Sequence, residues 1–194
     1  MKKDKLREYF SIPNILSYFR LILIPIYLVV YFMADEPGDY LWAALVIAIS
    51  GLTDMFDGKI ARHFNMITEW GKLIDPVADK LTMASVALSL AFRFPLMRLV
   101  FALYVVKEGF MAIMGLIMLR RGFRMDGAMW YGKICTAITY AVVFLLLLVP
   151  GMAPWLQAAL ISLQIVVTLF SFIMYAIYYH KVWKQMKKNK GPVV

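Results

Sequence analysis

The chain has 194 residues, of which 62% are hydrophobic and only 17% are charged. This composition excludes a water-soluble globular domain and is typical of a single membrane domain, residues 1–194. The formal net charge of +9 does not indicate a nucleic-acid-binding protein, because the basic residues cluster at the ends of apolar segments; anionic lipid headgroups are the expected partner instead. The single cysteine, Cys135, excludes an intrachain disulfide, and its apolar surroundings favour a buried hydrophobic role.

The first residues, 1–10, combine basic side chains with an apolar side and precede a long apolar run. They predict a segment that lies in the membrane interface, with a solvated basic tail as an equal alternative. The apolar run, 11–33, has no small-residue cleavage site and is expected to be a retained first span. Three polar residues share one face of this span, Asn14, Ser17 and Arg20, and they predict a polar lining directed at the functional site.

Acidic residues crowd the turn at 34–39, which lacks Lys and Arg and is therefore predicted to lie outside the cytoplasm. In the second span, which follows this turn, Asp54 lies roughly 20 Å along a helix that crosses about 30 Å of hydrocarbon. This depth places Asp54 towards the cytoplasmic side. The connection 63–70 comes next, and the third helix is capped by either Thr68 or Asp75, an alternative that the sequence leaves open.

The remaining apolar segments complete the predicted topology. Basic residues precede the first span, occupy the loop between the fourth and fifth spans and follow the last span, so both termini are predicted to be cytoplasmic. The prediction is an all-α membrane protein with six transmembrane helices. The later segments are a third span that ends near Phe94, spans at 95–119, 129–150 and 153–179, and a basic cytoplasmic tail at 180–194.

Four aspartates interrupt the second and third predicted helices. Asp54 and Asp57 are i, i+3 neighbours, and Asp75 and Asp79 are i, i+4 neighbours, so each pair lies on one face of its helix. Charges are unfavourable in hydrocarbon, and four close carboxylates stay ionised only if cations neutralise them. Interhelical salt bridges alone do not explain the cluster, because the neighbouring Arg and Lys residues are too few. Hard oxygen ligands suit Mg²⁺, Mn²⁺ or Ca²⁺.

Small residues lie beside the two acidic pairs. Gly58, Ala61 and Gly71 keep the intervening surface low, which lets a bulky phosphorylated ligand approach the backbone. From Asp54 to Asp79 the chain reads Asp-x-x-Asp-Gly-x-x-Ala-Arg, then eight residues, then Gly-x-x-x-Asp-x-x-x-Asp. This pattern matches the signature of the CDP-alcohol phosphotransferases, also called the CDP-alcohol phosphatidyltransferase family, and the chain resembles that family position for position.

The resemblance implies a reaction and a set of roles. Members of the family transfer a phosphatidyl or similar phosphoryl group from a CDP-linked donor to an alcohol and release CMP. By motif position, two divalent cations, Mg²⁺ or Mn²⁺, would be held by Asp54, Asp57, Asp75 and Asp79. Asp79 would also be the general base, and Asp75 is the second residue assigned to catalysis. The donor, CDP-diacylglycerol, would be bound by Asn14, Arg20, Asp57, Gly58, Ala61, Arg62 and Gly71.

The chemistry of these residue types supports the same mechanism. Two cations can neutralise the pyrophosphate of the donor and the charge that develops on the departing CMP. A carboxylate among other acids can accept the proton of the attacking hydroxyl group. No Ser, Cys or His is placed to form a covalent intermediate, so direct in-line attack of the alcohol on the lipid-side phosphorus is the expected route.

The sequence leaves two acceptors open. The stretch from Thr68 to Lys80 and the chain length resemble bacterial phosphatidylglycerophosphate synthases, whose acceptor is glycerol 3-phosphate, and this is the first expectation. Lys107 stands where that group has an arginine and Cys135 where it has a lysine, which lowers the positive charge and favours, as the alternative, a CMP-forming cardiolipin synthase that uses phosphatidylglycerol. The other interpretation of these charges is a structural ion pair of Glu108 with Lys107 or Lys133. The expected acceptor-binding residues are Lys107, Glu108, Arg120, Arg121, Arg124 and Lys133.

Two other classes are weaker alternatives. A six-helix transporter could use buried acids as an ion or proton path, but it predicts repeated halves that the sequence does not show. A lipid-binding scaffold would not need Asp79. The loop charges and the depth of Asp54 predict an active site that faces the cytoplasm, and the placement of the basic residues predicts contact with membrane lipids and no nucleic-acid partner. The family resemblance further implies an integral protein of a bacterial cell membrane and a homodimer.

Overall fold

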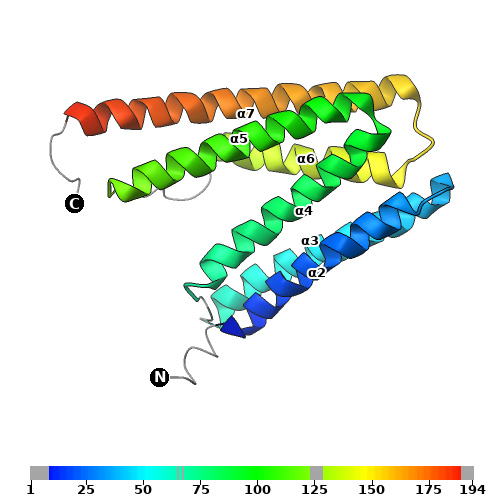
Figure 1. Cartoon of the computed structure of the whole chain (residues 1–194), viewed down its shortest axis with the longest axis horizontal. Helices are drawn as coiled ribbons and strands as arrows, with labels where there is room; N and C mark the ends of the chain where they lie inside the picture. Colours follow the sequence, from blue (N-terminus) through cyan, green and yellow to red (C-terminus); the bar gives the residue numbers. More distant parts are fainter. Residues whose placement is uncertain (1–8, 65, 67, 123–128, 189–194) are drawn as a thin grey trace. The chain divides into compact units, whose positions relative to one another are not determined.

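The computed structural model of the chain describes residues 9–64, 66, 68–122 and 129–188, without the side chains of Arg62, Lys187 and Lys188. Within these ranges the chain forms six α-helices and one short 3₁₀ turn, Pro37–Asp39 (Figure 1). The predicted all-α class is confirmed. The helices are α2 (Ile12–Phe32), α3 (Tyr40–His63), α4 (Gly71–Arg93), α5 (Pro95–Arg120), α6 (Trp130–Leu148) and α7 (Pro154–Lys188).

Five segments of the described chain are long and apolar enough to cross a membrane. They are Ile12–Phe32, Pro37–Ala61, Pro95–Arg120, Trp130–Leu148 and Pro154–Met186. The remaining helix, α4, carries Lys72, Asp75, Asp79 and Lys80 in its first half. By length and composition, the described ranges therefore contain five of the six predicted spans, and α4 is a helix whose first half is charged.

The start of α4 and the break between α4 and α5 follow local signals in the sequence. The hydroxyl of Thr68 accepts a hydrogen bond from the N–H of Gly71 at 2.9 Å, so Thr68 caps the start of α4. Of the two caps that the sequence leaves open, Asp75 is therefore wrong; it lies inside the helix. Phe94 is extended, with φ −115° and ψ 111°, as expected for a residue before a proline, and α5 starts at Pro95.

The C-terminal helix is longer than predicted. The sequence places a basic tail at 180–194, but α7 continues to Lys188. The residues that extend it, 180–188, include no Gly or Pro, and six of the nine are Lys, Gln or Met, which favour helix. The first part of the predicted tail is therefore helical. The rest of the tail, 189–194, and most of the predicted interfacial segment, 1–8, lie outside the described residues.

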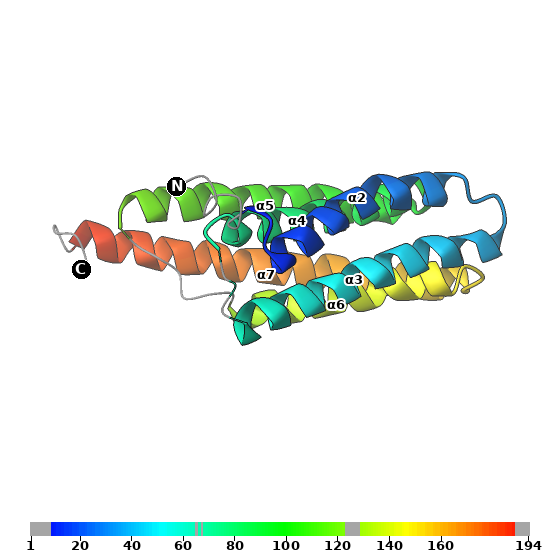
Figure 2. The ribbon, with the colours of Figure 1, turned by 90° about the horizontal axis from the view of Figure 1, so that it is seen from below.

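The chain divides into two compact units, each described by itself. The first comprises residues 1–90 and 144–151, and in it α2 and α3 pack as an antiparallel pair (Figures 1 and 2). Ala78 of α4 is fully buried, and its small side chain lets α4 approach its neighbours in this unit. The hydroxyls of Tyr27 and Ser89 share a hydrogen bond of 2.6 Å that joins α2 to α4. The three helices thereby bring their charged ends into one unit.

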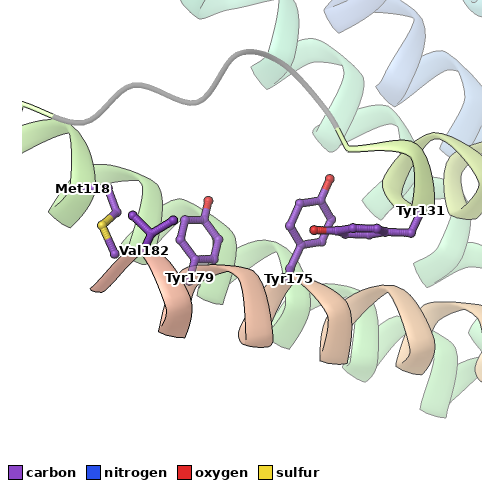
Figure 3. Packing of buried hydrophobic residues seen from close by; sticks show 5 residues of the cluster. All are labelled: Met118, Tyr131, Tyr175, Tyr179 and Val182. Atoms are coloured by element: carbon purple, nitrogen blue, oxygen red, sulfur yellow. The ribbon is translucent and has the colours of Figure 1, made fainter. Parts of the chain in front are cut away.

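The second unit comprises residues 91–143 and 152–194, and in it α5 and α7 lie side by side. A buried cluster, shown in Figure 3, consists of Met118, Tyr131, Tyr175, Tyr179 and Val182. The rings of Tyr131 and Tyr175 meet edge to face with their centroids 4.7 Å apart. A Cβ atom at Gly132 would collide with the Tyr175 side chain, lying 3.1 Å from its Cζ. Glycine at this position therefore allows α6 to approach α7.

Candidate active site

Two helices of the first unit bring four aspartates together. Asp54 and Asp57 lie about one turn apart on α3, and Asp75 and Asp79 lie about one turn apart on α4. Carboxylate oxygens of Asp54, Asp57 and Asp75 all lie within 4.8 Å of one another. The side chain of Asp57 is buried, whereas the other three are between 38% and 49% exposed. The cluster therefore has one buried acid and three that remain open to a ligand.

A single arginine from α2 lies among these acids. The side chain of Arg20 is only 1% exposed, and its guanidinium contacts all four carboxylates. Nη1 donates to Asp54 and, at 3.1 Å, to Asp79. Nη2 donates to Asp75 and, at 2.7 Å, to Asp57. The sequence indicates that Arg20 shares a polar face with Asn14 and Ser17, but it does not indicate that one guanidinium reaches every acid of the cluster.

The charges of this cluster do not balance. One guanidinium offsets one of the four negative charges, so additional positive charge is favourable beside the remaining acids. Carboxylate oxygens are hard ligands of the kind that Mg²⁺ and Mn²⁺ prefer. The oxygens of Asp54, Asp57 and Asp75 are close enough to share one ion. The residues present therefore fit a divalent cation.

A pocket of about 130 Å³ opens beside the acids, within the first unit. Its wall comes from the start of α2, the end of α3, the connection that follows, and the first turns of α4. Of the seven residues expected to bind the donor, five line the pocket, and Arg20 lies among the acids instead. The lining residues are Pro13, Asn14, Ser17, Asp57, Gly58, Ala61, Met66, Thr68, Gly71, Lys72 and Asp75.

Hydrogen bonds between α2 and the start of α4 hold one wall of this pocket. Nδ2 of the buried Asn14 donates to the hydroxyl of Thr68 at 3.0 Å, and the same hydroxyl accepts the N–H of Gly71. A Cβ atom at Gly71 would lie 2.5 Å from Oδ1 of Asn14 and 2.9 Å from Oγ1 of Thr68. Because neither distance is sterically possible without movement, this close approach requires glycine at position 71.

Further contacts tie the connection before α4 to α2 and to Tyr9, which precedes α2. Nε1 of Trp70 donates to the hydroxyl of Tyr18 at 2.6 Å, and the Trp70 ring meets the ring of Tyr9 edge to face at 5.3 Å. The hydroxyl of Ser17 donates to Asp75 at 3.4 Å. The start of α2 therefore positions both the connection and the first acid of α4.

Besides Pro13 and Ser17 at the start of α2, three residues of the pocket wall carry no motif position and were not assigned to the donor by the sequence: Met66, Thr68 and Lys72. Thr68 is marked in the sequence only as a candidate helix cap, and the structure gives this cap a second role as the partner of Asn14. The side chain of Arg62, which the motif assigns to the donor, lies outside the described part of the chain.

The residues expected to bind the acceptor belong to the second unit. Lys107 is buried in α5 and forms an ion pair with Glu108 at 2.8 Å. This is the pair that the sequence leaves as the other interpretation of these charges. Lys133, in contrast, is exposed on α6. Within the described residues, the two lysines thus have different surroundings.

The three arginines of the predicted basic loop are described only in part. Arg120 ends α5 and is exposed. The guanidinium of Arg121 lies over the ring of Trp183, 4.0 Å from its centroid, an arrangement typical of a cation–π contact. Arg124 lies outside the described residues.

Comparisons with known proteins give a consistent result. The profile of the family described as CDP-alcohol phosphatidyltransferase matches residues 10–170. The chain is 36% identical over 140 residues to a CMP-forming cardiolipin synthase of Streptomyces coelicolor. This match covers 71% of the present chain and 65% of the cardiolipin synthase, which is less than two thirds of the length of that enzyme. The chain is 33% identical over 176 residues to the CDP-diacylglycerol–glycerol-3-phosphate 3-phosphatidyltransferase of Salmonella paratyphi A, covering 86% of this chain and 93% of that enzyme. The Escherichia coli enzyme of the same name is 32% identical over 172 residues, with the same coverage.

Proposed function

The chain belongs to the CDP-alcohol phosphatidyltransferase family, and we propose that it transfers the phosphatidyl group of CDP-diacylglycerol to glycerol 3-phosphate, releasing CMP and forming phosphatidylglycerophosphate. The observation that carries the proposal is the meeting of the four motif aspartates from α3 and α4 beside a pocket lined by the motif's small residues. The choice of acceptor is supported by the two glycerol-3-phosphate enzymes above, which this chain matches over 93% of their length.

In this proposal the acids hold two divalent cations, Mg²⁺ or Mn²⁺, through Asp54, Asp57, Asp75 and Asp79. When bound, the cations would neutralise the pyrophosphate of the donor and the charge on the leaving CMP. The spacing of the oxygens of Asp54, Asp57 and Asp75 supports the assignment. The exposure of Asp54, Asp75 and Asp79 leaves room for substrate beside them.

Asp79 is proposed as the general base. Its carboxylate is half-exposed at the edge of the cluster, so a hydroxyl group can approach it, and it has acidic neighbours that make proton uptake easier. The attacking alcohol would pass its proton to Asp79 while its oxygen bonds to the lipid-side phosphorus and the bond to the CMP oxygen breaks. Asp75 is the second residue proposed to act in catalysis, and the hydrogen bond that it accepts from Ser17 of α2 positions its carboxylate.

The pocket beside the acids is proposed to receive the cytidine and phosphate groups of the donor. Asn14 and Gly71 form one wall, and Gly58 and Ala61 leave the opposite wall low. Asp57 connects this pocket to the acids, since it belongs to both. Arg62 is assigned to the donor by its motif position, and Arg20 is assigned to it by its place among the acids that border the pocket.

Lys107, Glu108, Arg120, Arg121, Arg124 and Lys133 are proposed to bind the acceptor. The exposed Lys133 supports an anionic acceptor such as glycerol 3-phosphate, because its charge is available to a phosphate group. One observation favours the alternative acceptor, phosphatidylglycerol, and hence a CMP-forming cardiolipin synthase. The charge of Lys107 is already paired with Glu108, which leaves less positive charge for a phosphomonoester dianion.

We further propose the membrane arrangement that the sequence predicts. The charged first half of α4 would lie at the cytoplasmic side. Its apolar second half would let α4 span the membrane as the third of six transmembrane helices. Both termini would be cytoplasmic, and the first residues would lie in the interface. The whole chain, 1–194, would act as one catalytic domain in a bacterial cell membrane, as a homodimer. The five long apolar segments support this arrangement.

The experiment that tests the function gives the purified protein CDP-diacylglycerol, Mn²⁺ and one acceptor at a time. Release of CMP and the mass of the lipid product are measured. Glycerol 3-phosphate should yield phosphatidylglycerophosphate. If only phosphatidylglycerol yields a product, cardiolipin synthase is the correct assignment. If no alcohol supports CMP release from an intact, metal-loaded protein, the proposed activity is wrong.

A further inference from the structure

Arg20 and a divalent cation would draw on the same carboxylates. The nitrogens of Arg20 contact one oxygen from each acid: Oδ1 of Asp54, Oδ2 of Asp57, Oδ1 of Asp75 and Oδ1 of Asp79. Three of these carboxylates are the ones whose oxygens lie close enough to share an ion. The cluster as a whole favours more positive charge, but like charges repel strongly at short distance in a partly buried site. A guanidinium that contacts all four carboxylates therefore competes with a divalent ion for them.

The pocket beside the acids offers the guanidinium of Arg20 a second position. Its Nε is buried and has no hydrogen-bond partner among the residues that the structure describes. The pocket of about 130 Å³ borders Asp57 and Asp75, two of the partners of Arg20, and Ser17, which lies about one turn before it on α2. Arg20 itself is not on the pocket wall. Because an arginine side chain is long and rotates about several bonds, a guanidinium released from the acids can reach this pocket.

We propose that Arg20 is an exchangeable internal cation. It holds the acids of α3 and α4 together until divalent cations bind, then leaves them and binds a phosphate group of the ligand in the adjacent pocket, for which its planar, bidentate geometry is suited. The inference rests on the proposed function, which supplies the cations and a phosphate-bearing donor. It gives Arg20 a positioning role that the motif does not contain, because the arginine prevents four uncompensated acids from facing one another before the cations arrive.

The test measures Mn²⁺ binding directly, without turnover. Free Mn²⁺ is followed by electron paramagnetic resonance during titration of the purified protein at mildly alkaline pH, where the acids are ionised. Arg20→Gln removes the competing charge, so it should bind Mn²⁺ roughly fivefold or more tightly than the wild type. Lys72→Gln is the matched control, because Lys72 also carries one positive charge at the pocket but pairs with Glu69 rather than with the acids. It should bind Mn²⁺ within about twofold of the wild type.

A second measurement follows the thermal unfolding midpoint in EDTA and in Mn²⁺. In EDTA, Arg20→Gln should unfold at a lower temperature than the wild type. Addition of Mn²⁺ should raise its unfolding midpoint by more than it raises that of the wild type. If this variant cannot be purified, Arg20→Lys replaces it; a lysine makes fewer of the four contacts, so Mn²⁺ should again bind more tightly than in the wild type.

The outcomes separate this inference from the function on which it rests. If the wild type binds no Mn²⁺, or if Asp57→Asn does not weaken binding, the proposed metal site is wrong. If the wild type binds Mn²⁺ and Asp57→Asn weakens it, the metal site stands. In that case, equal or weaker Mn²⁺ binding by the Arg20 variant overturns the exchange, because no competition was relieved.

Discussion

Replacement of Gly71 by alanine tests whether the contact between α2 and the start of α4 shapes the donor pocket. The added Cβ would lie 2.5 Å from Oδ1 of Asn14 and 2.9 Å from Oγ1 of Thr68, so at least one of these two side chains must move to make room for it. Two hydrogen bonds that the Thr68 hydroxyl accepts, from Nδ2 of Asn14 at 3.0 Å and from the N–H of Gly71 at 2.9 Å, should therefore lengthen or break.

The expected loss follows from these two bonds. Each contributes about 1 kcal/mol, and the lower chain entropy of alanine in the unfolded state returns about 0.5–1 kcal/mol. The free energy of unfolding should fall by about 1–1.5 kcal/mol, which for a chain of this size lowers the unfolding midpoint by roughly 2–6 °C. Because Asn14, Thr68 and Gly71 all line the pocket, the KM for CDP-diacylglycerol should rise severalfold while that for the acceptor stays unchanged.

The matched control is Gly51→Ala. Gly51 lies within α3 in the same unit, and a Cβ atom there would meet nothing within 4 Å. This change should be neutral or stabilise the helix by up to about 1 kcal/mol. Differential scanning fluorimetry and CMP-release kinetics measure both variants. A Gly71→Ala protein with the midpoint and donor KM of the wild type would refute the reasoning that this close approach holds the pocket in shape.

The remaining predictions concern the reaction itself. Asp79→Asn should lower the rate of transfer, measured as CMP release, by about 10²-fold or more. Binding of labelled CDP-diacylglycerol should stay within about twofold, because the amide retains the shape of the acid. Loss of donor binding would make Asp79 chiefly a metal ligand. Lys107→Ala and Lys133→Ala should each raise the KM for glycerol 3-phosphate severalfold without changing the donor KM, and unchanged constants would exclude both lysines from the acceptor site. Direct attack predicts that labelled CMP is not incorporated into CDP-diacylglycerol in the absence of an alcohol, whereas incorporation would indicate a covalent intermediate.

Much of the helical organisation could be predicted because its signals are local. Pro95 excludes its predecessor from helix, and the structure starts α5 there. The predicted first span, 11–33, differs from α2 by one residue at each end. The choice between Thr68 and Asp75 as a cap could not be made from the sequence, since both residue types accept the same hydrogen bond. That choice depends on Asn14, which binds Thr68 from another helix.

The chemistry of the site could be predicted from residue types, but its internal contacts could not. The i, i+3 and i, i+4 spacings place the aspartates on helix faces, and the family motif identifies them as a set. The place of Arg20 depends on how α2 packs against α3 and α4, which no spacing along one helix reveals. The pairing of Lys107 with Glu108 rather than with a ligand is likewise a matter of side-chain direction. The extra helical turns of α7 beyond residue 179 show that charge alone does not end a helix.

The measurement that tests the central claim most directly is the dependence of CMP release on a divalent cation. The purified protein is treated with EDTA, supplied with CDP-diacylglycerol and glycerol 3-phosphate, and then titrated with Mn²⁺, in parallel with Asp57→Asn. CMP release should fall to background in EDTA and return with Mn²⁺, and the variant should need more Mn²⁺ for half of its maximal rate. Undiminished CMP release in EDTA would contradict the claim that the aspartates of α3 and α4 act by holding divalent cations.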